Sequence, residues 1–150
     1  MVSEYEQYEI KCKKIRKQNE ALLNEFASWL RKLNLKDKTI DKHVDNIDFY
    51  INEYLLYEEP TEAKNGVYRA SMFLGYWFIK KAIWSSPAQV KSNAASLKKF
   101  YTFMLEKGLI DKEDLENLKE TIKEEMPEWL ATMGRYDDLS ITDMEDVWRI

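Results

Sequence analysis

The stretch that decides the fold is residues 86–108, SPAQVKSNAASLKKFYTFMLEKG. Ser86 is followed by Pro87 and, three positions on, by Gln89, which is the capping-box pattern of a helix start with proline at its first position. An apolar stripe at helical spacing follows, made of Val90, Ala94, Leu97, Tyr101, Met104 and Leu105. Gly108 stands where a glycine commonly ends a helix. These signals predict one long helix between Ser86 and Gly108.

Upstream of this stretch the apolar period is again helical. A first helix is predicted from the spacing of Leu22, Leu23, Phe26, Trp29, Leu30 and Leu33, and it can extend back through Cys12 and Ile15. Asn34 is expected to end it. A second helix is predicted to begin near Asp37 or Thr39, both common N-caps, and to stop at Pro60.

A third helix is predicted from about Thr61 or Asn65 to Trp84, and it is apolar around most of its circumference. Downstream of Gly108, Asp111 is expected to open a short helix and Pro127 a turn or further short helix. Residues 134–138 are expected to form a loop, and residues 140–143 to cap a last helix with Met144, Val147 and Trp148. The sequence therefore predicts an all-α protein.

Composition supports one folded domain without a disulfide framework. The 150 residues are 45% hydrophobic and 33% charged, with four glycines and three prolines. One cysteine and one histidine argue against a cysteine zinc site, a histidine-rich metal site and a Ser-His-Asp triad. The longest apolar run, Met72 to Ile79, is far short of the ~20 residues that span a membrane, and no signal peptide is found. We expect a cytoplasmic protein without a metal, cofactor or membrane segment.

Charge is distributed in blocks along the chain, whose net charge is −4. Residues 1–17 carry a net +2 and residues 18–63 a net −5. Residues 64–107 hold eight basic residues and one carboxylate, Glu106, for a net +7, whereas residues 108–150 carry a net −8. The +7 block is either an ordinary solvated surface or a face kept positive for a polyanion.

Two stretches carry a resemblance to a known family. The first contains Phe26, Ala27, Ser28, Trp29, Leu30, Leu35, Thr39, Ile40, His43, Ile47, Phe49, Tyr50, Tyr54 and Leu55. The second runs from Ser86-Pro87 through residues 94–104 to Glu106-Lys107-Gly108-Leu109-Ile110. Together they resemble the N-terminal core-binding domain of tyrosine recombinases (phage integrases). The resemblance implies a four-helix SAM-like orthogonal bundle over residues 20–110. Outside it we expect a helical extension at 1–19 and an acidic helical extension at 111–150.

The chain also departs from that family. Lys36 stands where the family has a serine, and the proline after the last bundle helix is missing. The family's catalytic domain supplies arginines, a His-x-x-Arg pair and a tyrosine nucleophile. Here the one histidine, His43, is followed by Val44-Asp45-Asn46, and we find no such motif. We therefore do not carry over DNA cleavage, and we expect no catalytic residues and no enzyme activity.

The resemblance implies that two helices lie against a DNA backbone. On the long helix Lys91, Ala95, Lys98 and Thr102 form one line, with Lys99 beside it and Ser92 and Asn93 in the first turns. At the start of the second helix the candidates are Lys38, Thr39, Lys42 and His43, and at the end of the third helix they are Lys80 and Lys81. Each lysine row is equally compatible with the wet face of an amphipathic helix. Arg69 is the one arginine of the +7 block, so little bidentate reading of guanine is available. We therefore expect phosphate contact with weak sequence preference.

A rival hypothesis is a protein-interaction or self-association module without DNA binding. Its partner surface would use apolar residues of the last segment, Trp129, Met133, Trp148 and Ile150, beside the −8 tail. A third hypothesis joins the two, because an acidic tail folded over the +7 block would compete with DNA. Ion pairs between the lysines of the long helix and Glu113, Glu116 or Glu120 would weaken the DNA hypothesis.

Overall fold

The computed structural model describes residues 3–81 and 86–137, and every regular element in these ranges is helical, which confirms the all-α prediction. The main elements are α1 (Glu4–Lys32), α2 (Asp37–Phe49), α5 (Pro87–Glu106) and α6 (Lys112–Asp137). Between α2 and α5 lie the π-helical turn η1 (Tyr50–Tyr54), the 3₁₀ turn η2 (Ala63–Gly66), and the consecutive segments α3 (Ala70–Met72), η3 (Phe73–Trp77) and α4 (Phe78–Lys81).

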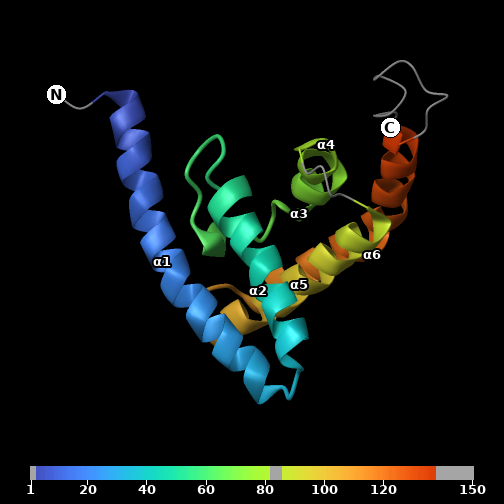
Figure 1. Cartoon of the computed structure of the whole chain (residues 1–150), viewed down its shortest axis with the longest axis horizontal. Coiled ribbons are helices and arrows are strands. Elements are labelled where there is room, and N and C mark those ends of the chain that lie inside the picture. The colour runs from blue at the N-terminus through green and yellow to red at the C-terminus, as the bar shows by residue number, and fades with distance from the viewer. Residues whose placement is uncertain (1–2, 82–85, 138–150) are drawn as a thin grey trace.

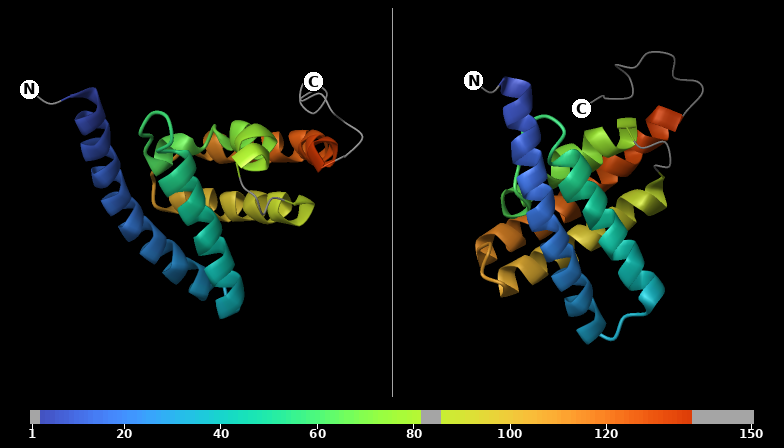
Figure 2. Two further views of the ribbon diagram at one scale, coloured as in Figure 1. Left: turned by 45° about the horizontal axis from the view of Figure 1, so that its top comes forward. Right: turned by 60° about the vertical axis from the view of Figure 1, so that its left-hand side comes forward.

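Figures 1 and 2 show how these helices are layered. α1 and α2 are joined by a short turn and diverge from it (Figure 1), and the N-terminal half of α1 packs against Leu56. α5 packs against α2 on one side and against α6 on another, and α6 also packs against α3 and η3. In the left view of Figure 2, α5 forms one layer, and α3, α4 and α6 form a second layer above it.

The local signals that flank the long helices are confirmed. Ser86 Oγ accepts a hydrogen bond from the Gln89 backbone N–H at 3.1 Å, as a capping box requires. Gly108 has φ +77°, the left-handed conformation that glycine adopts at low cost. Asn34 ends α1 in the same region, at φ +63°. The expected cap of α2 is wrong, because Lys36 is the N-cap residue and Asp37 already lies in the first turn.

The predicted start of the third helix is also wrong. Residues 63–66 form a 3₁₀ turn, and the continuous helical segment begins at Ala70. Two buried tyrosines hold that turn: Tyr50 Oη donates to the Gly66 carbonyl and Tyr101 Oη to the Ala63 carbonyl, both at 2.7 Å. These bonds occupy backbone acceptors that a helix would use, so tertiary contacts override the local pattern. Trp84 lies outside the described residues.

α6 is longer than the sequence predicts. It runs unbroken through Pro127 and through residues expected to form a loop, up to Asp137. A proline inside a helix costs ~3 kcal/mol, since it removes one backbone hydrogen bond. Burial offsets this cost because the apolar stripe of α6 continues past the proline with Trp129 and Met133, which are 3% and 1% exposed. The last helix predicted after the cap at residues 140–143 lies outside the described residues.

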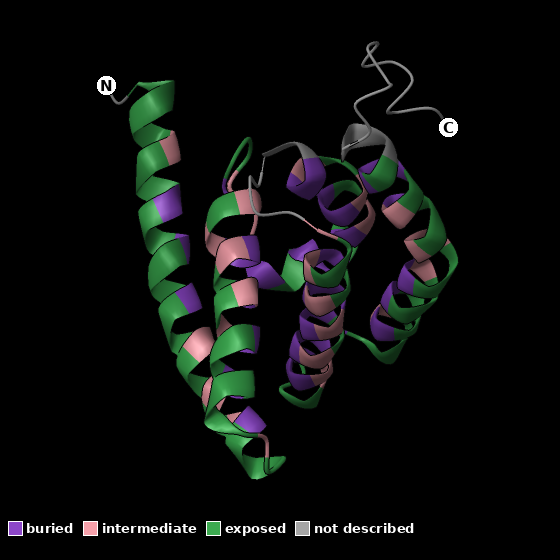
Figure 3. Cartoon of the chain, turned by 45° about the vertical axis from the view of Figure 1, so that its right-hand side comes forward, coloured by how far each residue is buried: buried purple, intermediate pink, exposed green. Residues whose placement is uncertain are grey.

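The core is continuous from α1 to α6. Phe26, Phe100 and Phe103 pack at its centre, with ring centroids of Phe26 and Phe100 5.3 Å apart. Buried residues line the inner faces of the helices in Figure 3. The N-terminal part of α1 has its own small cluster, in which Cys12 and Ile15 pack against Leu56. α1 is thus one helix across the expected boundary at 19/20, and the buried residues of α6 belong to the main core.

Within the described residues, no helix combines the length and the hydropathy needed to cross a lipid bilayer.

Candidate nucleic-acid interface

The contact between α2 and α5 is polar at its rim and buried at its centre. His43 Nδ1 lies 2.7 Å from Ser96 Oγ, and Ser96 is fully buried. The amide of Asn46 donates to Ser96 Oγ at 2.9 Å and to Ser92 Oγ at 3.0 Å. Since a hydrogen bond weakens steeply with misalignment, these three bonds fix the register of α2 against α5.

That register brings lysines of the two helices to one side of the pair. Burial lowers the pKa of His43, and the positive charges of Lys99 and then of Lys42 lower it further. Lys42 is the sequence neighbour of His43, and Lys99 follows Ser96, the partner of His43, by three residues on α5. His43 itself is only 8% exposed, so it positions the two helices and offers little surface to a ligand.

The line of residues predicted on α5 reaches solvent. Lys91 and Lys98 are exposed, and Lys99, Ser92 and Thr102 are half-buried. Thr102 Oγ1 donates to the Lys98 carbonyl at 2.7 Å, which is a helix back-bond and leaves its lone pairs without an external donor. Lys38, Thr39 and Lys42 are exposed on α2.

Asn93 does not belong to this surface. It is 3% exposed, and its amide donates to the Gln89 carbonyl at 2.8 Å. The sequence places Asn93 in the first turns of α5, but its side chain points into the core. Lys80 and Lys81 end α4, and their side chains lie outside the described residues.

The lysines of this surface are not neutralised by carboxylates in the described part of the chain. The ion pairs found there join Lys64 to Glu62, Lys107 to Glu25 and Lys112 to Glu116. None joins Lys91, Lys98 or Lys99 to Glu113, Glu116 or Glu120. The one carboxylate of the +7 block, Glu106, accepts a hydrogen bond from Trp29 Nε1 at 3.0 Å at the far end of α5.

The carboxylates of α6 bond on another side of the molecule. Asp114 accepts from the Tyr68 hydroxyl and from the Asp111 backbone N–H, and these two bonds hold its pKa below the usual range. Glu125 accepts from Ser71 Oγ at 2.5 Å. α6 thus directs carboxylates towards the segment that contains α3.

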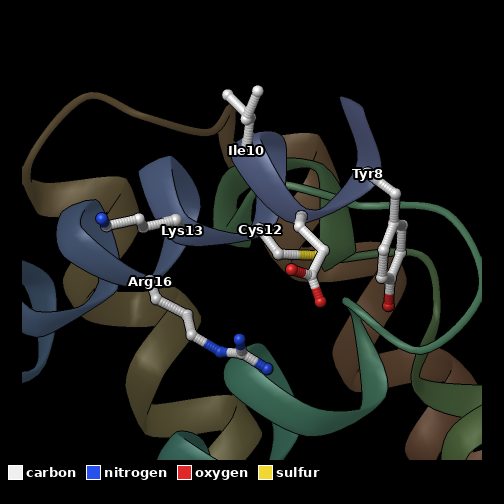
Figure 4. A pocket seen from close by; sticks show the side chains of 6 residues that line it. Tyr8, Ile10, Cys12, Lys13 and Arg16 are labelled. Atoms are coloured by element: carbon white, nitrogen blue, oxygen red, sulfur yellow. The ribbon is translucent and has the colours of Figure 1, made fainter. Parts of the chain in front are cut away.

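Cavities also lie elsewhere on the molecule. One, of about 540 Å³, is lined by side chains of α1 alone (Figure 4). Tyr8, Cys12 and Arg16 point to one side of the helix there, and Ile10 points to the other (Figure 4). Cys12 is only 3% exposed, so its thiol is packed and not presented. No group of His, Cys, Asp and Glu side chains in the described ranges could hold a metal ion.

Two residues that the rival hypothesis needs on the surface are in the core. Trp129 and Met133 are buried against the main cluster, so a partner surface cannot include them. Trp148 and Ile150 lie outside the described residues.

Neither protein-family models, nor curated proteins, nor solved structures give a match to this chain.

Proposed function

We propose that this protein binds the phosphate backbone of double-stranded DNA without cleaving it, as its resemblance to recombinase core-binding domains implies. The contact surface, named here the α2–α5 lysine surface, consists of Lys38, Thr39, Lys42, Lys91, Ser92, Lys98, Lys99 and Thr102. The observation that carries the proposal is that its exposed lysines have no carboxylate within 4.0 Å in the described part of the chain. Such a protein would act in the cytoplasm, as the sequence predicts.

The mechanism is electrostatic. Each lysine that contacts a phosphate releases a condensed counterion, so affinity falls with salt by a log–log slope of about 0.9 per contact. Short side chains such as Ser92 and Thr102 let the backbone approach between the lysines. Asp41 and Asp45, which interleave with the lysines of α2, reduce the local potential. We therefore expect micromolar affinity and weak sequence preference.

Fluorescence anisotropy of a labelled random duplex at about 50 and about 200 mM salt tests the proposal. The triple variant Lys91→Ala, Lys98→Ala and Lys99→Ala should bind at least tenfold more weakly and show a shallower salt dependence. A matched control removes the same charge from exposed lysines elsewhere, as Lys17→Ala, Lys119→Ala and Lys123→Ala. Equal losses of DNA affinity in the two triple variants would show that only the net charge of the protein matters. The absence of binding at low salt would contradict the proposal.

The acidic C-terminus offers a further test. Deletion of residues 111–150 would remove α6 from the core and unfold the protein, so it cannot test autoinhibition. Deletion of residues 138–150 removes four carboxylates and one arginine and leaves the described part of α6 intact. If these residues compete with DNA, their deletion should tighten binding several-fold at 50 mM salt. An unchanged affinity would exclude autoinhibition by this segment.

Protein association is the second candidate function. Tyr68, Met72 and Tyr76 follow one another at intervals of four residues from the turn before α3 into η3, and they are 59%, 59% and 40% exposed. Sedimentation at increasing concentration tests self-association through this stripe, and the variant Met72→Lys should abolish it if it occurs.

A further inference from the structure

Two adjoining cavities lie away from the α2–α5 lysine surface, between α1, residues 54–62 and the segment that begins at Arg69. Each has a volume of about 370 Å³, a size typical of small-ligand pockets. Glu59 and Arg69 line both, so the two cavities share a wall. Their remaining linings differ in chemistry, one being cationic and the other aromatic.

The cationic cavity gathers three basic side chains from distant parts of the sequence. Lys11 and Lys14 come from α1, and Arg69 comes from the segment after η2. No carboxylate lies within 4.0 Å of any of the three in the described residues, whereas Glu62 in the same lining lies 3.7 Å from Lys64. Polar side chains of Thr61 and Asn65 complete the wall. Three cations against the two carboxylates of the lining, Glu59 and Glu62, leave it with a net positive charge, which a bound anion offsets.

The aromatic cavity is built where the two π-helical turns meet. Tyr54 belongs to η1 and Trp77 to η3, and their ring centroids are 5.2 Å apart at 63°. Tyr57 lies edge-on to Trp77 at 5.7 Å, and Tyr76 and Met72 form the outer wall. The indole N–H of Trp77 is buried and has no acceptor among the described residues. A buried donor without an acceptor is uncommon in proteins.

Arg69 joins the two linings. Burial raises the pKa of Tyr54, and the guanidinium charge of Arg69 opposes that rise. A guanidinium has five N–H donors, which suit an oxyanion. A cluster of aromatic rings can also bind a quaternary ammonium, but the positive charge of Arg69 disfavours such a cation in the aromatic cavity.

We propose that the two cavities together bind a nucleoside monophosphate, with the phosphate between Lys11, Lys14 and Arg69 and the base against Tyr57, Tyr76 and Trp77. Aromatic side chains stack on bases of any sequence, and cations beside them hold the phosphate. Glu58 and Glu59 at the aromatic cavity are acceptors for an exocyclic amino group, which favours adenine or cytosine over uracil. The group is either a free nucleotide or the 5′-phosphorylated end of a single strand. The proposal does not rest on DNA binding by the α2–α5 lysine surface, because it uses none of that surface's residues.

Titration of the ¹⁵N-labelled full chain followed by NMR tests this site, with 5′-AMP, adenosine and ribose 5-phosphate as probes. AMP should shift the amide signals around residues 54–77 and bind at least tenfold more tightly than either fragment. Arg69→Gln, and separately Lys11→Gln with Lys14→Gln, should weaken AMP at least tenfold. Lys13→Gln with Lys17→Gln removes the same charge from α1 outside both linings and should leave AMP binding unchanged.

A hexamer of deoxyadenosine with and without a 5′-phosphate separates the two sources. Tighter binding of the phosphorylated hexamer than of AMP identifies a strand end, and tighter binding of AMP identifies a free nucleotide. Equal affinity for AMP and ribose 5-phosphate, or shifts confined to residues 91–102, would overturn the proposal. The variant Lys91→Ala with Lys98→Ala and Lys99→Ala should keep AMP binding, so failure of the DNA proposal and failure of this one are distinguishable.

Discussion

α5 has two contrasting contacts along its length. Against α6 it shares one apolar core, to which α6 contributes Leu118 and Ile122. Against α2 it carries a polar network of His43 and Asn46 with the serines of α5. Apolar burial contributes free energy in proportion to area, whereas a hydrogen bond adds little net energy and demands one geometry. The first contact holds the bundle together, and the second sets where the lysines of α2 and α5 stand.

This division predicts the largest effect on the apolar side. Trp129→Ala should destabilise the protein by about 3–5 kcal/mol, because it empties a large buried site and removes the packing that offsets Pro127. Urea denaturation measures the change. Leu130→Ala, at a half-buried neighbouring position, is the control and should cost clearly less. A smaller loss for Trp129→Ala than for Leu130→Ala would contradict the assignment of α6 to the core.

Close approach of η3 and α6 gives the second effect. A Cβ added at Gly75 would lie 2.7 Å from Trp129 Nε1, so Gly75→Ala forces the two segments apart and should cost about 1–3 kcal/mol. At Gly134, inside α6, an added Cβ meets nothing within 4 Å. Gly134→Ala should therefore stabilise the helix by about 0.5–1 kcal/mol. Thermal unfolding of both variants would show shifts of opposite sign, and shifts of the same sign would refute this packing.

The local elements could be predicted from sequence and the tertiary ones could not. The Ser86 cap and the ends at Asn34 and Gly108 depend on residues a few positions apart, so the sequence contains their whole cause. The turn at 63–66 depends on hydroxyls of Tyr50 and Tyr101 that reach it across the core. Pro127 was expected to break a helix that packing of residues on both sides of it keeps intact.

The candidate surface also has features that the sequence predicts and features that depend on tertiary contacts. The exposed lysine row on α5 follows from helical geometry alone, which gives the angle between residues on one helix. Burial of Asn93 and the pairing of Ser96 with His43 depend on where α2 lies, and sequence periodicity gives no inter-helix distance. A signal was present in the two serines of α5, spaced four residues apart beside the apolar stripe, where small polar side chains suit a close polar contact.

The polar contact predicts the third effect. Ser96→Ala removes the partner of His43 and one of the two acceptors of Asn46 at a fully buried site, and should cost about 1–3 kcal/mol. Ser92→Ala is the matched control, because Asn46 then keeps Ser96 and the site is half-buried. Urea denaturation should rank the two losses in that order. DNA affinity should fall less in Ser96→Ala than in the triple lysine variant. A larger fall in Ser96→Ala would show that the polar network, and not the lysines, determines DNA binding.

The smallest effect comes from titration of His43. Its pKa in the folded protein lies below the ordinary 6.5, because burial and then Lys99 and Lys42 disfavour the imidazolium. The unfolded chain therefore binds a proton more readily, and the stability that the neutral ring contributes is fully present above pH 6.5 and is lost as the pH falls through the folded-state pKa. His43→Gln should flatten that part of the pH–stability curve. Lys99→Ala should raise the pKa of His43 measured by NMR, because it removes one of the two charges beside the ring. An unchanged pKa of His43 in Lys99→Ala would show that Lys99 lies away from α2. The lysines of α2 and of α5 would then not form one surface.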